Sequence, residues 1–249
     1  MSNIGLNLRR QDAVNIIQFD RIDKKNAITS EMYAAMAASL VQGDADNDVR
    51  VHLFLGQPGV FTAGNDIRDF VTSTARGAGL GEEVLAFLKA IITVGKPVVA
   101  GVDGFAIGIG TTLLLHCDLV YATERSFFQT PFVDLAVVPE AASSLVAPRM
   151  FGHHRAFELL ALGERWSAQD AVNYGLVNRI IEQPEIEKNT LNIATTLGLK
   201  PQGALKITRQ LLRGSEQELL QRLDHEAELF ADQLNSPEAQ AAFAKFLDR

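Results

Sequence analysis

The stretch from Val102 to Glu140 constrains the fold of this 249-residue chain more than any other. It opens with three glycines in seven residues, from Gly104 to Gly110, and continues into an apolar run over residues 111–120. Closely spaced glycines allow tight turns and let main-chain atoms approach a ligand. We expect the apolar run to form a buried helix, whose first N–H groups would bind a developing negative charge.

The same stretch ends in an isolated carboxylate, Glu140, which follows Val137-Val138-Pro139. We expect the glycine turn to hold an oxyanion while Glu140 moves a proton beside it. Two simpler interpretations stay open. A glutamate after proline is commonly an exposed residue in the first turn of a helix, and the glycines can be ordinary turn residues. Their Gly-x-x-x-Gly-x-Gly spacing is not the dinucleotide-binding fingerprint.

Composition limits the function classes. The single cysteine, Cys117, excludes an internal disulfide and predicts a reducing, cytoplasmic location. No apolar run approaches the ~18 residues that a membrane span requires, and the N-terminus lacks the pattern of a signal peptide. The net charge of −7 argues against general nucleic-acid binding. We therefore expect no membrane and no nucleic-acid partner.

Strand and helix patterns alternate over the first two-thirds of the chain, which predicts an α/β core. We expect a β-hairpin over residues 4–20, a helix that begins at Thr29 or Ser30, and buried strands at 51–56 and 97–102. Further on, helices are expected over 141–150 and 155–162, and a strand over 176–181. Residues 73–81 contain three glycines and are expected to form a mobile loop.

Helical patterns dominate the C-terminal part, so we divide the chain into a core over residues 1–195 and a helical region over 196–249. Ser167 and Ser215 each begin a capping-box pattern. An apolar stripe from Leu220 to Leu234 follows helical spacing and requires a surface to pack against, within the chain or in a neighbouring subunit.

Several short motifs, in their order along the chain, resemble the crotonase superfamily, also called the enoyl-CoA hydratase/isomerase family. The resemblance covers almost the whole chain. Its motifs are Lys25-Asn26-Ala27, Phe61-Thr62-Ala63-Gly64-Asn65-Asp66, Lys96-Pro97-Val98-Val99-Ala100, the glycine turn to Gly110, Cys117-Asp118, Ala168-Gln169-Asp170-Ala171 and Gly175-Leu176-Val177.

The resemblance implies a ββα superhelix with a C-terminal helical trimerisation region, assembled as homotrimers or hexamers. It implies an acyl-CoA thioester substrate, no metal and no cofactor other than the coenzyme A of the substrate. The two main-chain N–H groups that hold the thioester oxygen map to Asn65 and Ile109. The substrate-binding positions that it implies are Lys24, Ala63, Gly64, Asp66, Ile67, Gly108 and Phe132. Lys245 of a neighbouring subunit is expected to complete the nucleotide site.

Departures from the family pattern indicate the reaction. The two glutamates with which hydratases hold a water fall at Thr112 and Phe132, so two-carboxylate water addition is not expected. The carboxylate at Glu140 is similar to that of peroxisomal-type Δ3,Δ2-enoyl-CoA isomerases, enzymes of fatty-acid β-oxidation. Two alternatives remain: a crotonase-type hydratase of other specificity, and a non-catalytic acyl-CoA-binding homologue.

The histidines and the cysteine have no expected chemical role. His153 and His154 have no further metal ligand nearby in the sequence. His116 and Cys117 lie in the apolar run and are expected to be core residues.

Overall fold

The computed structural model describes residues 4–68 and 80–247, and within them two mostly parallel sheets. The large sheet has the strand order β1-β2-β3-β5-β7-β10, and the small sheet has the order β4-β6-β8-β9. The strands of the large sheet are β1 (Leu6–Gln11), β2 (Val14–Phe19), β3 (Val51–Leu55), β5 (Val98–Val102), β7 (Leu119–Ala122) and β10 (Arg179–Ile180). Those of the small sheet are β4 (Val60–Thr62), β6 (Phe105–Ile107), β8 (Phe127–Gln129) and β9 (Trp166–Ser167).

The connections between the sheets form a repeat. Each of β3, β5 and β7 in the large sheet is followed within a few residues by β4, β6 or β8 in the small sheet. Helices α3 (Glu82–Thr93) and α4 (Ile109–Thr112) return the chain after the first two of these pairs. This is the predicted ββα superhelix, so the α/β fold class is confirmed.

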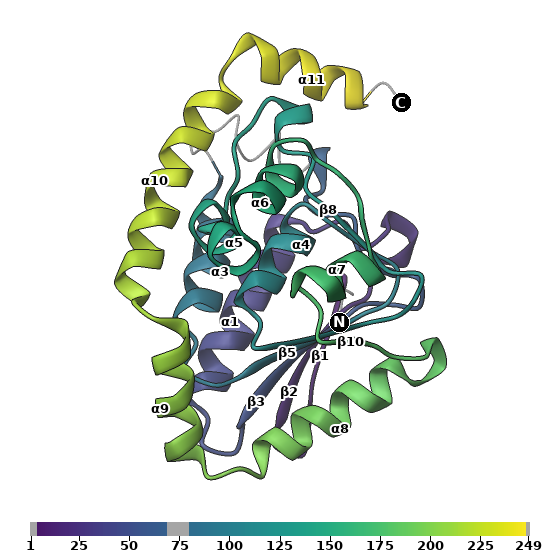
Figure 1. Cartoon of the computed structure of the whole chain (residues 1–249), viewed down its shortest axis with the longest axis vertical. Coiled ribbons are helices and arrows are strands. Elements are labelled where there is room, and N and C mark those ends of the chain that lie inside the picture. The colour runs from purple at the N-terminus through teal and green to yellow at the C-terminus, as the bar shows by residue number, and fades with distance from the viewer. Residues whose placement is uncertain (1–3, 69–79, 248–249) are drawn as a thin grey trace.

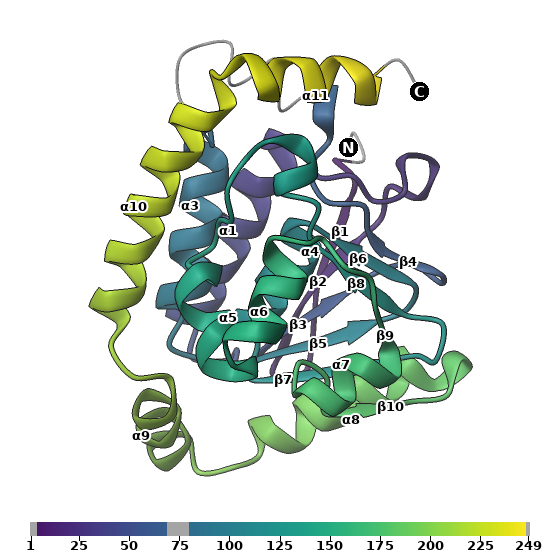
Figure 2. The same ribbon diagram turned by 45° about the horizontal axis from the view of Figure 1, so that its top comes forward.

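Central strands of the large sheet are buried on both faces, which explains their uninterrupted apolar sequences. Successive side chains of a strand point to opposite faces. On β3, Leu53 and Leu55 accordingly join the cluster packed on α8 (Ile186–Gly198), while Phe54 joins the larger core beneath α3 and α1 (Ser30–Ala45). Figure 2 shows α1 and α3 on one side of the sheet and α8 on the other.

Local sequence signals set several helix boundaries. Thr29 caps α1 by accepting a hydrogen bond from the N–H of Met32. Ser167 and Asp170 form the predicted capping box of α7 (Ala168–Tyr174). Ser215 caps the long helix α10. The remaining helices are α5 (Ser143–Phe151), α6 (His153–Leu160), α9 (Gln202–Arg213), α10 (Glu216–Leu234) and α11 (Pro237–Leu247).

The C-terminal helices enclose the core from outside. Figure 1 shows α10 running along one side of the molecule and α11 crossing its end. The stripe from Leu220 to Leu234 packs mainly against this chain's own core, since Leu223 is fully buried and Phe230 nearly so. The intramolecular alternative therefore describes this stripe. The division of the chain at residue 195 stays a prediction.

Three sequence expectations need correction. The run over 111–120 is not one helix: α4 is followed by a 3-10 turn over residues 113–116 and then by β7. The strand expected over 176–181 is limited to Arg179–Ile180, and α1 extends into the acidic segment that was expected to be a loop. The glycine loop expected over 73–81 lies almost wholly outside the described residues.

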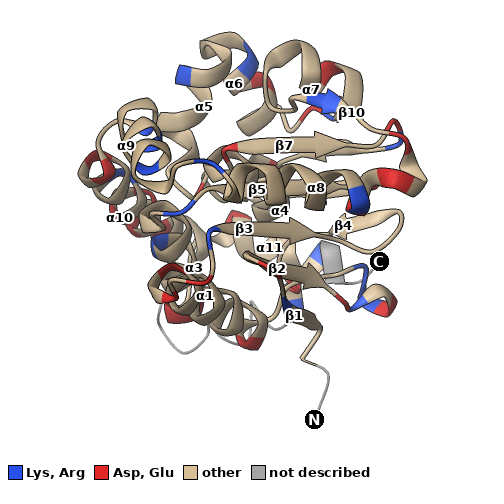
Figure 3. Ribbon diagram, turned by 90° about the horizontal axis from the view of Figure 1, so that it is seen from below, with Lys and Arg blue, Asp and Glu red and all other residues tan. Residues whose placement is uncertain are grey.

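Charge is concentrated on the periphery. Figure 3 shows β3, β5 and α4 without Lys, Arg, Asp or Glu, whereas the outer helices have both signs. Among the residues that the structure describes, no helix is long and apolar enough to cross a membrane.

Candidate active site

Two glycine turns meet where neighbouring strands of the small sheet end. Strands β4 and β6 are paired in parallel, so their carboxyl ends lie at the same edge. The turn after β4 contains Gly64 at φ +86°, and the turn after β6 contains Gly108 at φ +57°. A Cβ on Gly64 would lie only 2.7 Å from the carbonyl oxygen of Ile107. Glycine is required there because the two turns are in main-chain contact.

Asn65 and Ile109 follow these two glycines directly, so the contact brings both residues to one place. Within the described ranges, neither main-chain N–H donates a hydrogen bond to the protein. The Asn65 turn is fixed on both sides by Ile28, whose N–H donates to Gly64 over 2.8 Å and whose carbonyl accepts from Asp66 over 2.9 Å. The Tyr33 hydroxyl also donates to the Asn65 side-chain oxygen.

These two N–H groups can therefore stabilise a negative oxygen without first breaking a protein hydrogen bond. Helix α4 has only four residues, so its dipole adds less than the predicted long helix would have done. The rigidity of the two turns, rather than a helix axis, provides the geometry.

Glu140 lies in the turn before α5, outside any helix, which rules out the first-turn interpretation. Its side chain is buried, and the residue is only 2% exposed. One carboxylate oxygen, Oε1, accepts a hydrogen bond from the Thr112 hydroxyl, and Oε2 has no partner among the described residues. Burial raises the pKa of Glu140 to about 8; the Thr112 hydrogen bond opposes this rise, and the charge of Glu226 adds to it.

The two positions at which hydratases would have glutamates are occupied differently here. Thr112 is fully buried and makes its side-chain contact with Glu140. Phe132 is 6% exposed and presents an apolar ring to the same cavity. Neither position offers a carboxylate, so Glu140 is the only acidic side chain besides Asp66 that lines the cavity.

The turn that presents Glu140 is strained and held from behind. Ala141 and Ala142 have φ of +62° and +54°, a region that costs a non-glycine residue about 1–2 kcal/mol. His116 donates from Nε2 to the Ala141 carbonyl over 2.6 Å. Burial lowers the pKa of His116 to about 4, so its ring is neutral and Nδ1 is left to accept from Arg213 over 3.5 Å.

All ten predicted site residues line one cavity of about 870 Å³. They are Lys24, Ala63, Gly64, Asn65, Asp66, Ile67, Gly108, Ile109, Phe132 and Glu140. The roles that the resemblance assigns to them stay predictions. The cavity walls also include residues that the sequence alone did not single out, namely Arg21, Ala27, Thr29, Arg68, Ile107, Pro131, Leu135, Val137, Phe230 and Phe243. Phe230 and Phe243 come from α10 and α11.

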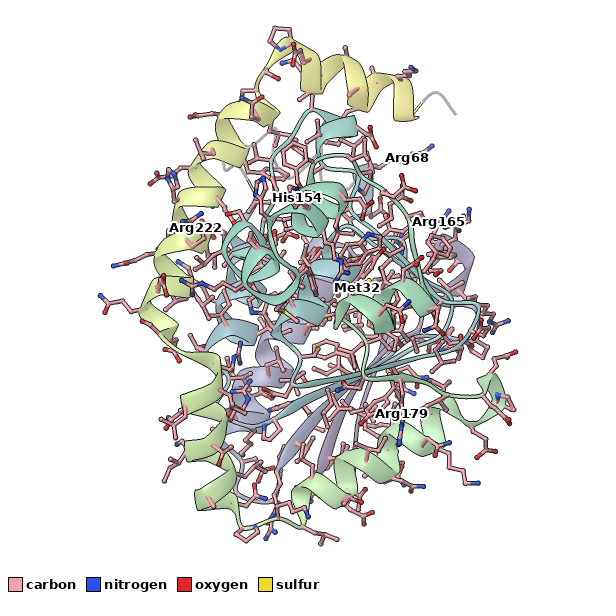
Figure 4. All side chains as sticks on the ribbon, viewed as in Figure 1. Met32, Arg68, His154, Arg165, Arg179 and Arg222 are labelled. Carbon is pink, nitrogen blue, oxygen red and sulfur yellow. The ribbon has the colours of Figure 1, made fainter. Side chains whose placement is uncertain are left out.

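One side of the cavity contains the cationic side chains. Arg21 forms a 2.7 Å ion pair with Asp66, which therefore has a protein partner of its own. Lys24 is exposed, and Arg68 also lines this side; Figure 4 shows Arg68 at the periphery. The opposite, apolar side is formed by Phe132, Leu135 and neighbours, so the cavity is suited to a ligand with one anionic and one apolar end.

No metal centre emerges from the described part of the chain. No group of three or more His, Cys, Asp or Glu side chains within it has the spacing of a metal site. The rings of His153 and His154 lie 5.8 Å apart on the exposed start of α6.

Comparison with known proteins agrees with the geometry. Residues 9–249 match the family described as enoyl-CoA hydratase/isomerase. The chain belongs to this family of acyl-CoA enzymes. A structure of OdaA from Pseudomonas aeruginosa superposes with a TM-score of 0.94 at 38% identity, covering 98% of this chain and 99% of that one.

Two curated relatives differ in their named reactions. Enoyl-CoA delta isomerase 2 of Rattus norvegicus is 34% identical over 226 residues, which are 89% of this chain but 58% of the rat protein. A 4-chlorobenzoyl coenzyme A dehalogenase of Arthrobacter is 27% identical over 98% of this chain and 91% of its own length. Family membership thus supports action on an acyl-CoA thioester, while the reaction must be argued from the site.

Proposed function

We propose that this chain is a Δ3,Δ2-enoyl-CoA isomerase in which Glu140 is the proton shuttle. The observation that supports this reaction is the pair of contacts around Glu140. Its Oε1 accepts from Thr112, and its Oε2 is buried without a protein partner on a cavity that also contains the N–H groups of Asn65 and Ile109. One base beside an oxyanion site is what the migration of a double bond requires.

In the proposed reaction, the Glu140 carboxylate takes a proton from C2 of a 3-enoyl-CoA. The electron pair of that C–H bond moves into the thioester, which becomes an enolate with its charge on oxygen. The N–H groups of Asn65 and Ile109 would stabilise that oxygen, and each such donor typically contributes ~10²–10³ in rate. The protonated Glu140 then returns the proton to C4, and the double bond settles between C2 and C3.

Burial suits Glu140 to both halves of this reaction. A carboxyl group with a pKa of about 8 is a stronger base than an exposed glutamate and still releases its proton to a carbon. The Thr112 hydroxyl keeps one oxygen occupied, so Oε2 is the atom available to the substrate. The cycle requires no separate cofactor, because the proton that leaves C2 is the one that C4 receives.

For the coenzyme A end, we propose the cationic side of the cavity. Lys24 would contact the nucleotide, and Ala63, Asp66 and Ile67 would contact the adenine and pantetheine, as the family resemblance implies. A Lys245 side chain from a neighbouring subunit would complete this site.

A homotrimer or hexamer is also part of the proposal, although the reason differs from the one that the sequence offered. Helix α9 exposes a row of large apolar side chains, including Ile207, Leu211 and Leu212, the last of them 82% exposed. A monomer would leave this face in water. Light scattering at micromolar concentration should give a trimer or a hexamer, and a monomer would contradict the assembly.

The proposed reaction is tested by Glu140→Gln, which keeps the side-chain volume but cannot accept a proton at carbon. We expect loss of isomerisation of a 3-enoyl-CoA by roughly 10²–10⁴-fold or more in kcat, with an unchanged far-UV spectrum. Glu124→Gln, at an exposed turn, is the matched control and should retain full activity. Full activity of the Glu140 variant would overturn the proposal.

The same assays separate the alternatives. Hydration of a 2-enoyl-CoA at a rate comparable to isomerisation would favour a hydratase. Measurable affinity for acyl-CoA without turnover of 2-enoyl, 3-enoyl or aromatic acyl-CoAs would favour a non-catalytic binder.

A further inference from the structure

Glu226 is a second buried acid that approaches the Glu140 turn from behind. It lies on α10, is 4% exposed, and accepts a hydrogen bond at Oε1 from the Ser144 N–H over 2.9 Å. Its other oxygen, Oε2, is buried and has no partner among the described residues. An acid rarely occupies such a position without a function, because removing a carboxylate from water is costly.

The surroundings of Glu226 do not neutralise it through an ion pair. Arg222, one helical turn earlier on α10, directs its guanidinium to the Ser144 hydroxyl over 3.1 Å. Figure 4 labels Arg222 on α10, at the side facing α5. Thus Glu226 and Arg222 grip the same residue, Ser144, by its main chain and its side chain respectively.

The Glu140 turn is therefore clamped at two points. His116 holds the carbonyl of Ala141 from the core side, and Glu226 holds the N–H of Ser144 from the α10 side. Ala141 and Ala142, both at positive φ, lie between or at these points. Strained main chain persists only where surrounding contacts over-determine it, and these two contacts do so.

We propose that Glu226 is a positioning residue for Glu140: it fixes the 140–144 turn from α10 and places a second negative charge behind the catalytic carboxylate. This inference deepens the proposed function and rests on the assignment of Glu140 as its base. The charge of Glu226 makes Glu140 hold its proton more tightly, and Glu140 acts on Glu226 in the same way. Burial is the larger cause for both acids: it raises the pKa of Glu226 to about 7, against hydrogen bonds from Ser144 and Ala142 and the charge of Arg222.

Other charged groups around the turn are accounted for. His116 is neutral, and Arg213 lies behind it. Arg149 on α5 is paired with Glu218 on α10. The remaining groups that face the two acids are Thr112, which is uncharged, and Arg222. Glu226 is thus the acid whose charge Glu140 senses.

The test compares Glu226→Gln with Glu226→Ala in the full-length protein. Glutamine keeps an oxygen that can accept from Ser144 but has no charge, whereas alanine loses both. In Glu226→Gln, the midpoint of the pH profile of kcat/KM should fall by about one pH unit, since like charges at this range interact by more than 1.4 kcal/mol at low effective dielectric. Glu226→Ala should lose kcat as well, and Glu226→Gln should rescue that loss in part.

Glu228→Gln on the exposed side of α10 is the control and should leave the profile at its wild-type position. A midpoint that does not move in a folded Glu226→Gln variant would overturn the inference, since a purely structural residue predicts that outcome.

A second measurement does not depend on activity. In protein labelled with ¹³C at the glutamate carboxyls, Glu226 should titrate at lower pH in Glu140→Gln than in wild type, because the coupling between two sites is reciprocal. Unchanged titration of Glu226 would overturn the coupling even if isomerisation is established. A shifted titration with no isomerase activity would instead place the failure in the proposed function.

Discussion

Two buried carboxylates, Glu140 and Asp103, look alike in the sequence and differ sharply in the structure. Each is an isolated acid beside the glycine turn, and each is at most 5% exposed. Asp103 accepts from both Arg125 nitrogens over 2.6–2.7 Å, from the Thr123 hydroxyl over 2.8 Å and from the Gly59 N–H over 3.0 Å. Glu140 has one donor, Thr112, and one oxygen without a partner.

The opposite pKa shifts follow from these partners. Burial alone would raise the pKa of Asp103, but the hydrogen bonds from Arg125, Thr123 and Gly59 outweigh it and lower the value. Burial of Glu140 is opposed by a single hydroxyl, so its pKa rises. The comparison teaches that burial marks neither a structural nor a reactive acid by itself. The number of donors around the carboxylate decides between the two.

The largest expected effect on stability is at Asp103. Asp103→Ala would leave the Gly59 N–H and the Thr123 hydroxyl without their acceptor and remove the partner of Arg125. We expect a loss of about 2–5 kcal/mol in the free energy of unfolding, measured by urea denaturation.

The pH dependence sharpens this expectation. Asp103 has a lowered pKa in the folded state, so its stabilisation is present above the unfolded value of about 3.8 and lost as the pH falls through the folded value. The deficit of Asp103→Ala should therefore shrink in acid. Loss of kcat in the folded fraction, with no loss of stability, would reverse the roles of the two acids.

Glu140→Gln should do the opposite and stabilise the protein at alkaline pH. The folded state holds the Glu140 proton up to about pH 8, whereas the unfolded chain releases it near pH 4.5. Between these values the wild-type free energy of unfolding falls as pH rises, by a few kcal/mol at most. Melting temperatures at pH 5 and pH 9 should be similar at pH 5 and higher for the variant at pH 9. A variant that is less stable than wild type at pH 9 would contradict the raised pKa.

Thr112→Val removes the single donor to Glu140 while keeping the side-chain shape. Without this hydrogen bond, worth about 1.5–3 kcal/mol to a charged acceptor, the pKa of Glu140 should rise further. We expect kcat/KM at pH 7 to fall roughly ten-fold or more, with its pH midpoint moved upward, as steady-state kinetics across pH 6–10 would show. A midpoint below the wild-type value would mean that Thr112 does not act through this bond.

The smallest effect is expected at Lys24, which is exposed at the cavity edge. Lys24→Ala should raise KM for an acyl-CoA by the equivalent of about 1 kcal/mol or less, because exposed ion pairs are weak. The effect should diminish as salt is added, and kcat should remain nearly unchanged. A large loss of kcat at constant KM would show that Lys24 serves the chemistry or the fold.

The sequence predicted most of the catalytic region because its signals are local. Glycines at Gly64 and Gly108 mark the turns, and the residues after them are fixed by those turns. Glu140 stands out because no other charge lies near it in the sequence. The hairpin and the caps at Thr29 and Ser167 are likewise set by neighbouring residues.

What could not be predicted depends on contacts between distant segments. An apolar run over residues 111–120 has no periodicity that separates a helix from a short turn followed by a strand, and pairing of β7 with β5 decides the outcome. Glu226 reaches the Glu140 turn from a position 86 residues away in the chain. A signal was present, because Glu226 falls between Leu223 and Phe230 on the buried face of α10.

The central claim is that Glu140 carries one proton from C2 to C4. The most direct test uses a 3-enoyl-CoA deuterated at C2, with the product of the first turnovers examined by mass spectrometry and NMR. A buried shuttle that exchanges slowly with water should deliver a measurable part of the deuterium to C4, and Glu140→Gln should abolish the transfer. Hydrogen at C4 that comes entirely from solvent in the earliest turnovers would contradict the account.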